Sequence, residues 1–275
     1  MTFEIKKFGE GFWEEKEELP PKKVSKIPLC PKTLFGADKT KPCVQQVYGV
    51  SGSGKTVLLN AAATHAVRSK DFSDTWRLVV FDIKHQGYED LVKNTVSDME
   101  GFLKSLNRNR ITVIHPDIEE ADEFLDSVIN HLFELAQMSD DFSSTLILEE
   151  SSTFIGSGAW SIPSTIKRFA TQGRSLGLSL LLVNQRALSN KWTDTQSTGI
   201  VMFRMANPDN ELLKKRWGLN PQEIETRLME KKFSFAYYDL ENLSLDFYNP
   251  IKLRKTPSES KKGSSGTSGA KDQTT

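Results

Sequence analysis

The sequence predicts an α/β fold in which a mostly parallel sheet lies between helices and is followed by a C-terminal β-hairpin. Short, nearly continuous apolar runs alternate with segments in which apolar residues recur every three or four positions. This alternation is typical of a parallel sheet covered by helices on both faces. A glycine-rich turn joins the first apolar run to the first helical segment. Two later strand-like runs, residues 233–238 and 243–248, flank a turn at Asp239–Asn242, which predicts the hairpin.

Each expected element follows from its apolar pattern. The first strand, Val44–Tyr48, ends at the glycine-rich turn, and the fifth, Leu178–Val183, is the most apolar stretch of the chain. Helices are expected where apolar residues fall on one face, as they do at residues 58–67 and 124–133. In chain order, strands are expected at 44–48, 78–81, 111–114, 146–148, 178–183 and 200–205, and helices at 58–67, 88–103 and 124–133, with two short helices before the hairpin.

Composition restricts the class of protein. The 36 basic and 36 acidic residues leave no formal net charge, so any binding to polyanions is expected to be local. Hydrophobic residues make up 37% of the 275 residues, which is enough for a packed core. No apolar run approaches the roughly 18–20 residues that cross a bilayer, and the N-terminus lacks the apolar segment of a secretory signal. Cys30 and Cys43 lack the spacing of a zinc site or a disulfide scaffold, so we expect a soluble intracellular protein.

One folded domain is expected between two terminal segments. Residues 1–41 hold several prolines among lysines and glutamates, which predicts an extended N-terminal arm. From Lys255 onward the only hydrophobic residue is Ala270, so the tail at 251–275 is expected to be disordered. The folded domain then spans residues 42–250.

The glycine-rich turn carries a phosphate-binding motif. Gly49–Thr56 reads GVSGSGKT, which satisfies GxxxxGK[ST] and lies between a predicted strand and a predicted helix, as that motif requires. The glycines let the backbone N–H groups surround a phosphate chain, Lys55 neutralises the β- and γ-phosphates, and the Thr56 hydroxyl can ligate Mg²⁺. The sequence therefore predicts an ATP site, for which the expected binding residues are Gly49, Ser51, Gly52, Ser53, Gly54, Lys55, Thr56 and Val57.

Two adjacent acids end the predicted strand at 146–148. Glu149 fits the Walker-B position, which holds the shell of Mg²⁺, and Glu150 can polarise a water for attack on the γ-phosphate. Aspartate is usual at the first position, and Glu149 is one methylene longer, so its fit to the metal is open. The plain alternative is a solvated acidic turn. Gln185, after the fifth strand, can sense the γ-phosphate or hold the attacking water, unless it is only a polar residue leaving the sheet.

The order of these motifs resembles the FtsK–HerA superfamily of DNA-pumping ATPases, whose fold is a P-loop NTPase of the RecA/ASCE-like type. Val80–Lys84 is similar to the family's second-strand motif. Gln172–Leu178 resembles the GR-x-x-G segment before its sensor strand, and Ser197–Arg204 resembles the strand that follows. The resemblance covers residues 42–250. It implies a ring in which the arginine of one subunit reaches the neighbour's γ-phosphate, and Arg174 matches that position, with Arg168 as the weaker candidate and an ordinary surface arginine as the alternative.

In this sequence only an arm and a tail are expected beside the motor domain at residues 42–250. A motor domain with so few additions resembles the genome-packaging ATPases of membrane-containing icosahedral viruses, including archaeal ones. That resemblance implies a hexameric or pentameric ring that pumps double-stranded DNA, with ATP and Mg²⁺ as cofactors. Capsid-vertex, portal or membrane-vertex proteins are the implied partners, and the host cytoplasm or the virion vertex is the implied location. A cellular or plasmid translocase of the HerA-like or conjugative kind is the main alternative. A small-molecule P-loop kinase and a nucleotide-gated scaffold are alternatives from other classes, and Glu150 argues against the kinase.

Residues that contact DNA are less well marked. The candidates are Lys84–Gln86, residues 151–164 and Lys191–Trp192, and ordinary solvated loops are the alternative for each. Asn190–Thr193 resembles the guanine-reading NKxD motif, but its acid falls one residue late at Asp194, which argues against GTP. The histidines at positions 65, 115 and 131 show no ligand spacing and are expected to be structural.

Overall fold

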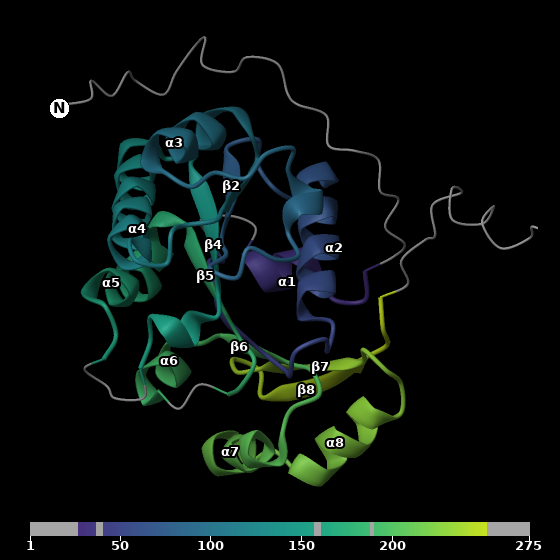
Figure 1. Ribbon diagram of the computed structural model, residues 1–275. Helices are drawn as coiled ribbons and strands as arrows, with labels where there is room; N and C mark the ends of the chain where they lie inside the picture. The colour runs from purple at the N-terminus through teal and green to yellow at the C-terminus, as the bar shows by residue number, and fades with distance from the viewer. Residues whose placement is uncertain (1–26, 37–40, 157–160, 188–189, 252–275) are drawn as a thin grey trace, which may run out of the picture.

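An eight-stranded sheet runs through the computed structural model, which describes residues 27–36, 41–156, 161–187 and 190–251 (Figure 1). The strands lie in the order β3-β2-β4-β5-β1-β6-β7-β8, and the first six in this order are parallel, while β7 and β8 are antiparallel. The strands are β1 (Val44–Tyr48), β2 (Trp76–Phe81), β3 (Ile111–Ile114), β4 (Ser143–Glu149), β5 (Leu178–Asn184), β6 (Gly199–Met202), β7 (Phe235–Asp239) and β8 (Ser244–Tyr248).

Helices cover both faces of this sheet. Figure 1 shows α1 and α2 on one face and α3, α4 and α5 on the other, with α7 and α8 beyond the hairpin. The helices are α1 (Pro31–Phe35), α2 (Lys55–Arg68), α3 (Met99–Arg108), α4 (Ala121–Met138), α5 (Ser164–Gln172), α6 (Lys191–Gln196), α7 (Asn207–Trp217) and α8 (Pro221–Met229). Three short 3₁₀ turns are η1 (Glu89–Leu91), η2 (Ser151–Thr153) and η3 (Gly173–Leu176).

Two hydrophobic cores lie on the two faces because successive strand residues point in opposite directions. Along β4, Leu146 and Leu148 belong to the core beneath α3, α4 and α5, whereas Ile147 belongs to the core beneath α1 and α2. All seven residues of β4 and of β5 are buried. Double-sided burial explains why these strands read as continuous apolar runs rather than alternating ones.

The predicted α/β fold with its hairpin is confirmed, and the differences are local. A helix was expected at 88–103, but α3 begins at Met99, where the Asp98 side chain accepts a hydrogen bond of 2.7 Å from the Gly101 N–H. Before it, Val96 bridges to Ile114 of β3, so the chain there is extended. The strand expected at 200–205 ends at Met202, and α6 was not expected.

Part of the predicted N-terminal arm is not extended. Residues 31–35 form α1, and Leu34 and Phe35 are completely buried in the core beneath α2. Residues 1–26 and 37–40 of that arm, and 252–275 of the predicted tail, lie outside the described residues. Within the part of the chain that the structure describes, no helix combines the length and apolar character needed to cross a membrane.

Candidate active site

The sheet order gathers the predicted motifs at one edge. In a parallel sheet all carboxyl ends lie at the same edge, and ligands bind where the strand order reverses. The strand β1 lies between β5 and β6, with Tyr48 in register with Asn184 on one side and Met202 on the other. Glu149, at the end of β4, is in register with Val183 of β5. The phosphate-binding loop, the acidic pair and Gln185 therefore converge at this edge.

The loop from Gly49 to Gly54 leaves β1 and starts α2. Gly54 has a left-handed φ of +108° and precedes the first helical residue, so the N-terminal N–H groups of α2 open toward the loop. Gly49 has no room for a side chain, because an added Cβ would lie 2.6 Å from the Phe203 Cβ. The Val50 N–H donates a bond of 2.9 Å to the Arg204 carbonyl, which ties the loop to the end of β6.

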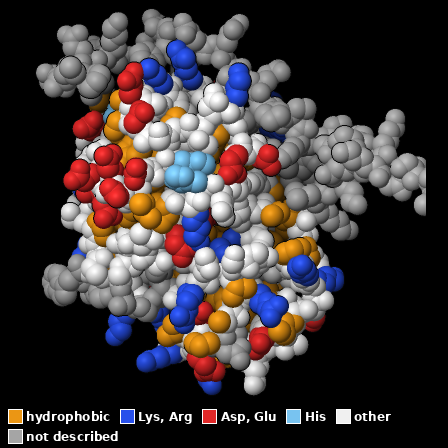
Figure 2. Space-filling view, in the orientation of Figure 1, with side chains coloured by type: hydrophobic (Ala, Val, Ile, Leu, Met, Phe, Trp, Pro, Cys, Tyr) orange, Lys and Arg blue, Asp and Glu red, His pale blue; other side chains and the backbone are white. Residues whose placement is uncertain are grey.

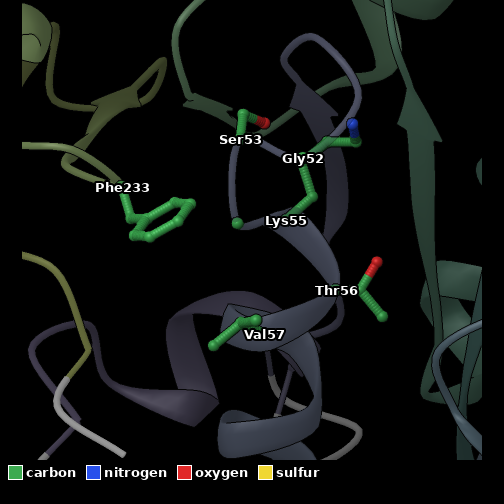
Figure 3. Close-up of a pocket in the computed structure, with 7 residues that line it drawn as sticks. Gly52, Ser53, Lys55, Thr56, Val57 and Phe233 are labelled. Carbon is green, nitrogen blue, oxygen red and sulfur yellow. The ribbon is translucent and has the colours of Figure 1, made fainter.

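The Lys55 ammonium lies inside this loop. It donates a hydrogen bond of 2.6 Å to the Gly49 carbonyl oxygen, with the Val50 carbonyl oxygen at 3.4 Å. Burial lowers the pKa of Lys55, and the nearby Glu149 carboxylate opposes that shift. A pocket of about 180 Å³ opens beside the loop and is lined by residues 52–57 together with Phe233 (Figure 3).

The acid Glu149 and the Thr56 hydroxyl share one neighbour. Tyr88 is completely buried, donates its hydroxyl hydrogen to the Glu149 carboxylate, and also forms a hydrogen bond with the Thr56 side chain. Burial raises the pKa of Glu149, and the carboxylate of Asp82 raises it further. Oxygen ligands of this kind are those that Mg²⁺ prefers, so the residues present fit that ion.

Glu150 stands in a different environment from Glu149. Its backbone is left-handed, with φ of +50°, which turns its side chain out of the strand direction. The carboxylate forms an ion pair with the Lys84 ammonium, and the Gln185 amide nitrogen lies 3.5 Å from the same oxygen. The structure thus places the predicted base beside the predicted sensor residue, and it pairs Lys84, a candidate for DNA contact, with the base.

Two supporting residues were not recognised from the sequence. The Asn184 side chain accepts a bond of 2.7 Å from the Ser152 N–H and donates one of 2.7 Å to the Ser151 hydroxyl, so it positions the segment that carries Glu150. Tyr88 was assigned only to the start of a helix. The available signal was that Asn184 ends β5 and Tyr88 follows β2, two strands whose carboxyl ends lie at the edge of the site.

The segment after β2 is braced by a buried acid. Asp82 is 1% exposed and accepts hydrogen bonds from the backbone N–H groups of Lys84 and Gln86 at 3.0 and 2.8 Å. His85 stacks on His115 with ring centroids 4.7 Å apart, and the His115 Nε2 lies 3.5 Å from the Asp82 carboxylate. Asp82 therefore fixes the backbone from which Lys84 reaches Glu150.

Arg174 lies at the opposite edge of the sheet from the phosphate-binding loop. It belongs to η3, which precedes the first residue of β5, Leu178, whereas the loop follows the last residue of the parallel neighbour β1. Burial raises the pKa of the Cys43 thiol to about 12, and Arg174 nearby opposes that shift, which places the arginine close to the start of β1. A strand rises about 3.3 Å per residue, so Arg174 is separated from its own loop by the length of the strand.

The other arginine candidate and the NKxD-like segment have structural contacts. The Arg168 guanidinium lies 4.1 Å from the ring centroid of Phe133. Asn190 caps α6 by accepting a bond of 2.9 Å from the Trp192 N–H. Asp194 forms an ion pair with Arg216 at 3.0 Å, and both side chains are mostly buried, so this carboxylate has a structural role. Residues 157–160, within the stretch 151–164 that is a candidate for DNA contact, lie outside the described residues.

These features define the fold of a P-loop NTPase: a glycine-rich loop between β1 and α2, and acids at the end of β4, two strands away. The sequence matches no protein-family model and no curated protein. Among solved structures, the chain is similar to B204, the DNA-packaging ATPase from Sulfolobus turreted icosahedral virus. The two are 18% identical with a TM-score of 0.59, over 77% of this chain and 99% of that one.

Two further solved structures share this fold. B204 from Sulfolobus turreted icosahedral virus 2, in complex with ATP-gammaS, matches with a TM-score of 0.60 and 16% identity, over 76% of this chain and 98% of that one. VirB4 of Thermoanaerobacter pseudethanolicus matches with a TM-score of 0.54 and 8% identity, over 82% of this chain and 93% of that one. The resemblance to genome-packaging ATPases that the sequence predicts is therefore confirmed at the level of the fold.

Removal of the Tyr88 hydroxyl tests how much its hydrogen bond to Glu149 contributes to stability. The Tyr88→Phe variant leaves a buried carboxylate without its donor, so the free energy of unfolding is expected to fall by about 1–3 kcal/mol. Urea denaturation measures this change. Tyr248→Phe is the matched control, because that half-buried ring stacks on Phe235 far from the acids. Equal stability of the two variants would show that the bond between Tyr88 and Glu149 contributes nothing.

Proposed function

We propose that this protein is an ATPase that moves double-stranded DNA, and that it works as a ring to package a viral genome. The observation that carries the proposal is the convergence of Lys55, Glu149, Glu150 and Gln185 at one edge of the sheet. A kinase of small molecules needs no second acid at the end of β4, whereas hydrolysis needs a base beside the γ-phosphate. The match to B204, with a TM-score of 0.59 and 18% identity against 0.54 and 8% for VirB4, supports packaging over the other translocases.

Each residue at this edge has a role that its position allows. Lys55 exchanges the Gly49 carbonyl oxygen for oxygens of the β- and γ-phosphates, and the N-terminal N–H groups of α2 bind the same chain. Thr56 and Glu149 would hold Mg²⁺, which, when bound, neutralises charge on the β- and γ-oxygens. Glu150 accepts a proton from the attacking water, and Gln185 orients that water. The bond from water oxygen to the γ-phosphorus forms as the bond to the leaving ADP oxygen breaks.

The surface charge limits where DNA can bind. Figure 2 shows acidic side chains gathered over α4 and basic side chains toward α7 and α8. The acidic group lies in the segment before α4 and in its first turns and includes Asp117, Glu119, Glu120, Asp122, Glu123 and Asp126. By contrast, the exposed Lys214 and Lys215 lie in the last turn of α7. Since phosphate backbones bind basic groups, we place the DNA away from α4.

The test is the ATPase rate with and without long double-stranded DNA at several protein concentrations. If DNA is the substrate and the site is completed by a neighbouring subunit, the rate per subunit is expected to rise with both DNA and protein concentration. Salt should weaken the effect of DNA, because contacts to phosphates release counterions. A rate that responds to neither variable contradicts the ring and the DNA substrate, and an absence of hydrolysis contradicts the ATPase itself.

A further inference from the structure

An aromatic side chain stands at the mouth of the pocket beside the phosphate-binding loop. Phe233, in the turn between α8 and β7, is 45% exposed and has a left-handed φ of +69°. That conformation is unusual for a bulky residue and costs conformational energy. Figure 3 shows the Phe233 ring on the side of the loop opposite Thr56. The motifs recognised in the sequence give this residue no role.

The turn holds the ring at a fixed place against the loop. A Cβ added to Gly54 would lie 3.5 Å from both the Cβ and the Cδ1 of Phe233, so the ring borders the loop directly. The next residues are anchored, since the Ser234 N–H donates a bond of 3.1 Å to the Lys231 carbonyl and Phe235 packs on Phe203 with centroids 5.3 Å apart. The face that Phe233 presents is therefore set by the fold.

The direction of a bound nucleotide follows from the sheet order. The γ-phosphate end is fixed by the acids of β4 and by Gln185 after β5, on one side of β1. The opposite end must leave the loop on the other side, toward β6 and β7, where Phe233 precedes β7. Val57, 41% exposed at the start of α2, lines the same pocket and adds a second apolar surface there.

We infer that the adenine base of ATP stacks on Phe233, with Val57 as the apolar wall beside it. This inference rests on the proposed function and assigns the part of the substrate that the phosphate-binding motif leaves open. Every base offers a flat π-face to an aromatic ring, so stacking contributes affinity whatever the base. The pocket thus binds the phosphates through the loop and the base through Phe233.

The test compares binding of ATP with binding of inorganic tripolyphosphate, which has the phosphates without the base. Phe233→Ala is expected to weaken ATP binding about tenfold, in line with the loss of one aromatic stack, and to leave tripolyphosphate binding unchanged. Calorimetry measures both ligands. Leu243→Ala is the matched control, because Leu243 is also exposed, at 72%, and also has a left-handed φ, of +52°, but lies in the β7–β8 turn.

The Phe233→Trp variant gives a second readout. It keeps an aromatic face, so ATP affinity is expected to stay within about twofold of the wild type, and its added fluorescence is expected to be quenched by ATP and not by tripolyphosphate. Unchanged ATP affinity in Phe233→Ala, or equal losses of affinity for both ligands, overturns the inference that adenine stacks on Phe233. If the wild-type protein binds neither ATP nor tripolyphosphate, the proposed function is contradicted instead. Unchanged binding of both ligands in Lys55→Ala would contradict it as well.

Discussion

The Glu150→Gln variant is expected to lose ATP turnover by about 10²–10⁴-fold while it still binds ATP and Mg²⁺. The amide has the shape of the carboxylate, but it cannot accept a proton from the attacking water. Glu149, Thr56 and Lys55 are untouched by the change, so the groups that hold nucleotide and metal stay in place. Steady-state phosphate release measures the turnover, and calorimetry with ATP and Mg²⁺ measures binding.

A matched control for this variant is Glu100→Gln. Glu100 also forms an ion pair with a lysine, Lys104, one turn further along α3, and both side chains are exposed on the surface. The loss of that pair is expected to leave turnover within about twofold of the wild type, since exposed pairs of this kind contribute little. Undiminished hydrolysis in Glu150→Gln would remove Glu150 from the role of base.

The different partners of Glu150 and Glu149 explain why Glu150→Gln is expected to affect hydrolysis and not nucleotide binding. Glu150 faces Lys84 and Gln185, whereas Glu149 faces Tyr88. The two adjacent acids therefore differ in partners and in burial, and burial raises the pKa of Glu149. Environments that differ in this way can give neighbouring carboxylates different roles, one toward a metal and one toward a water.

The sequence was sufficient to predict the fold because the strands are buried on both faces. Continuous apolar runs such as Leu178–Val183 indicate strands of a parallel sheet when the segments between the runs show helical spacing. The phosphate-binding loop was predictable for a different reason. The residue types of GxxxxGK[ST] determine the local conformation of the loop, provided that a strand precedes it and a helix follows it. Both predictions depend on local pattern.

The parts that the sequence could not predict depend on contacts between distant segments. Tyr88 reaches Glu149 across 61 positions, and Asn184 reaches Ser151 across 33. Neither contact follows from spacing along one element, because each joins segments at or after the ends of two strands whose order in the sheet was unknown. The position of Phe233 beside the phosphate-binding loop could not be predicted for the same reason, because it requires β7 to lie beside β6.

The expected helix at 88–103 shows how a tertiary contact overrides a periodic pattern. The apolar residues Leu91 and Val92 fit helical spacing with Met99 and Leu103, yet only η1 and α3 form. The Val96 N–H donates a bond of 3.0 Å to the Val113 carbonyl, and the His115 N–H donates one of 2.8 Å to the Val96 carbonyl. These bonds satisfy the backbone as an edge of the sheet, and Asp98 then starts the helix.

Arg174→Ala is expected to abolish turnover that depends on assembly, by about 10³–10⁵-fold, while nucleotide affinity stays close to that of the wild type. Arg174 lies before β5, at the edge of the sheet opposite its own phosphate-binding loop, so it cannot reach a γ-phosphate bound in the same chain. In the proposed ring, its charge would act on the γ-phosphate bound to a neighbouring subunit. Concentration-dependent phosphate release measures the loss.

Mixed assemblies separate a role across the interface from a structural one. Arg174→Ala subunits keep an intact base, and Glu150→Gln subunits keep an intact arginine, so an interface that pairs the loop of the first with the arginine of the second is complete. Mixing the two inactive proteins is therefore expected to restore part of the turnover, in proportion to the fraction of such interfaces. If Arg174 acts within its own chain or only supports the fold near Cys43, every interface in the mixture stays defective and no activity returns.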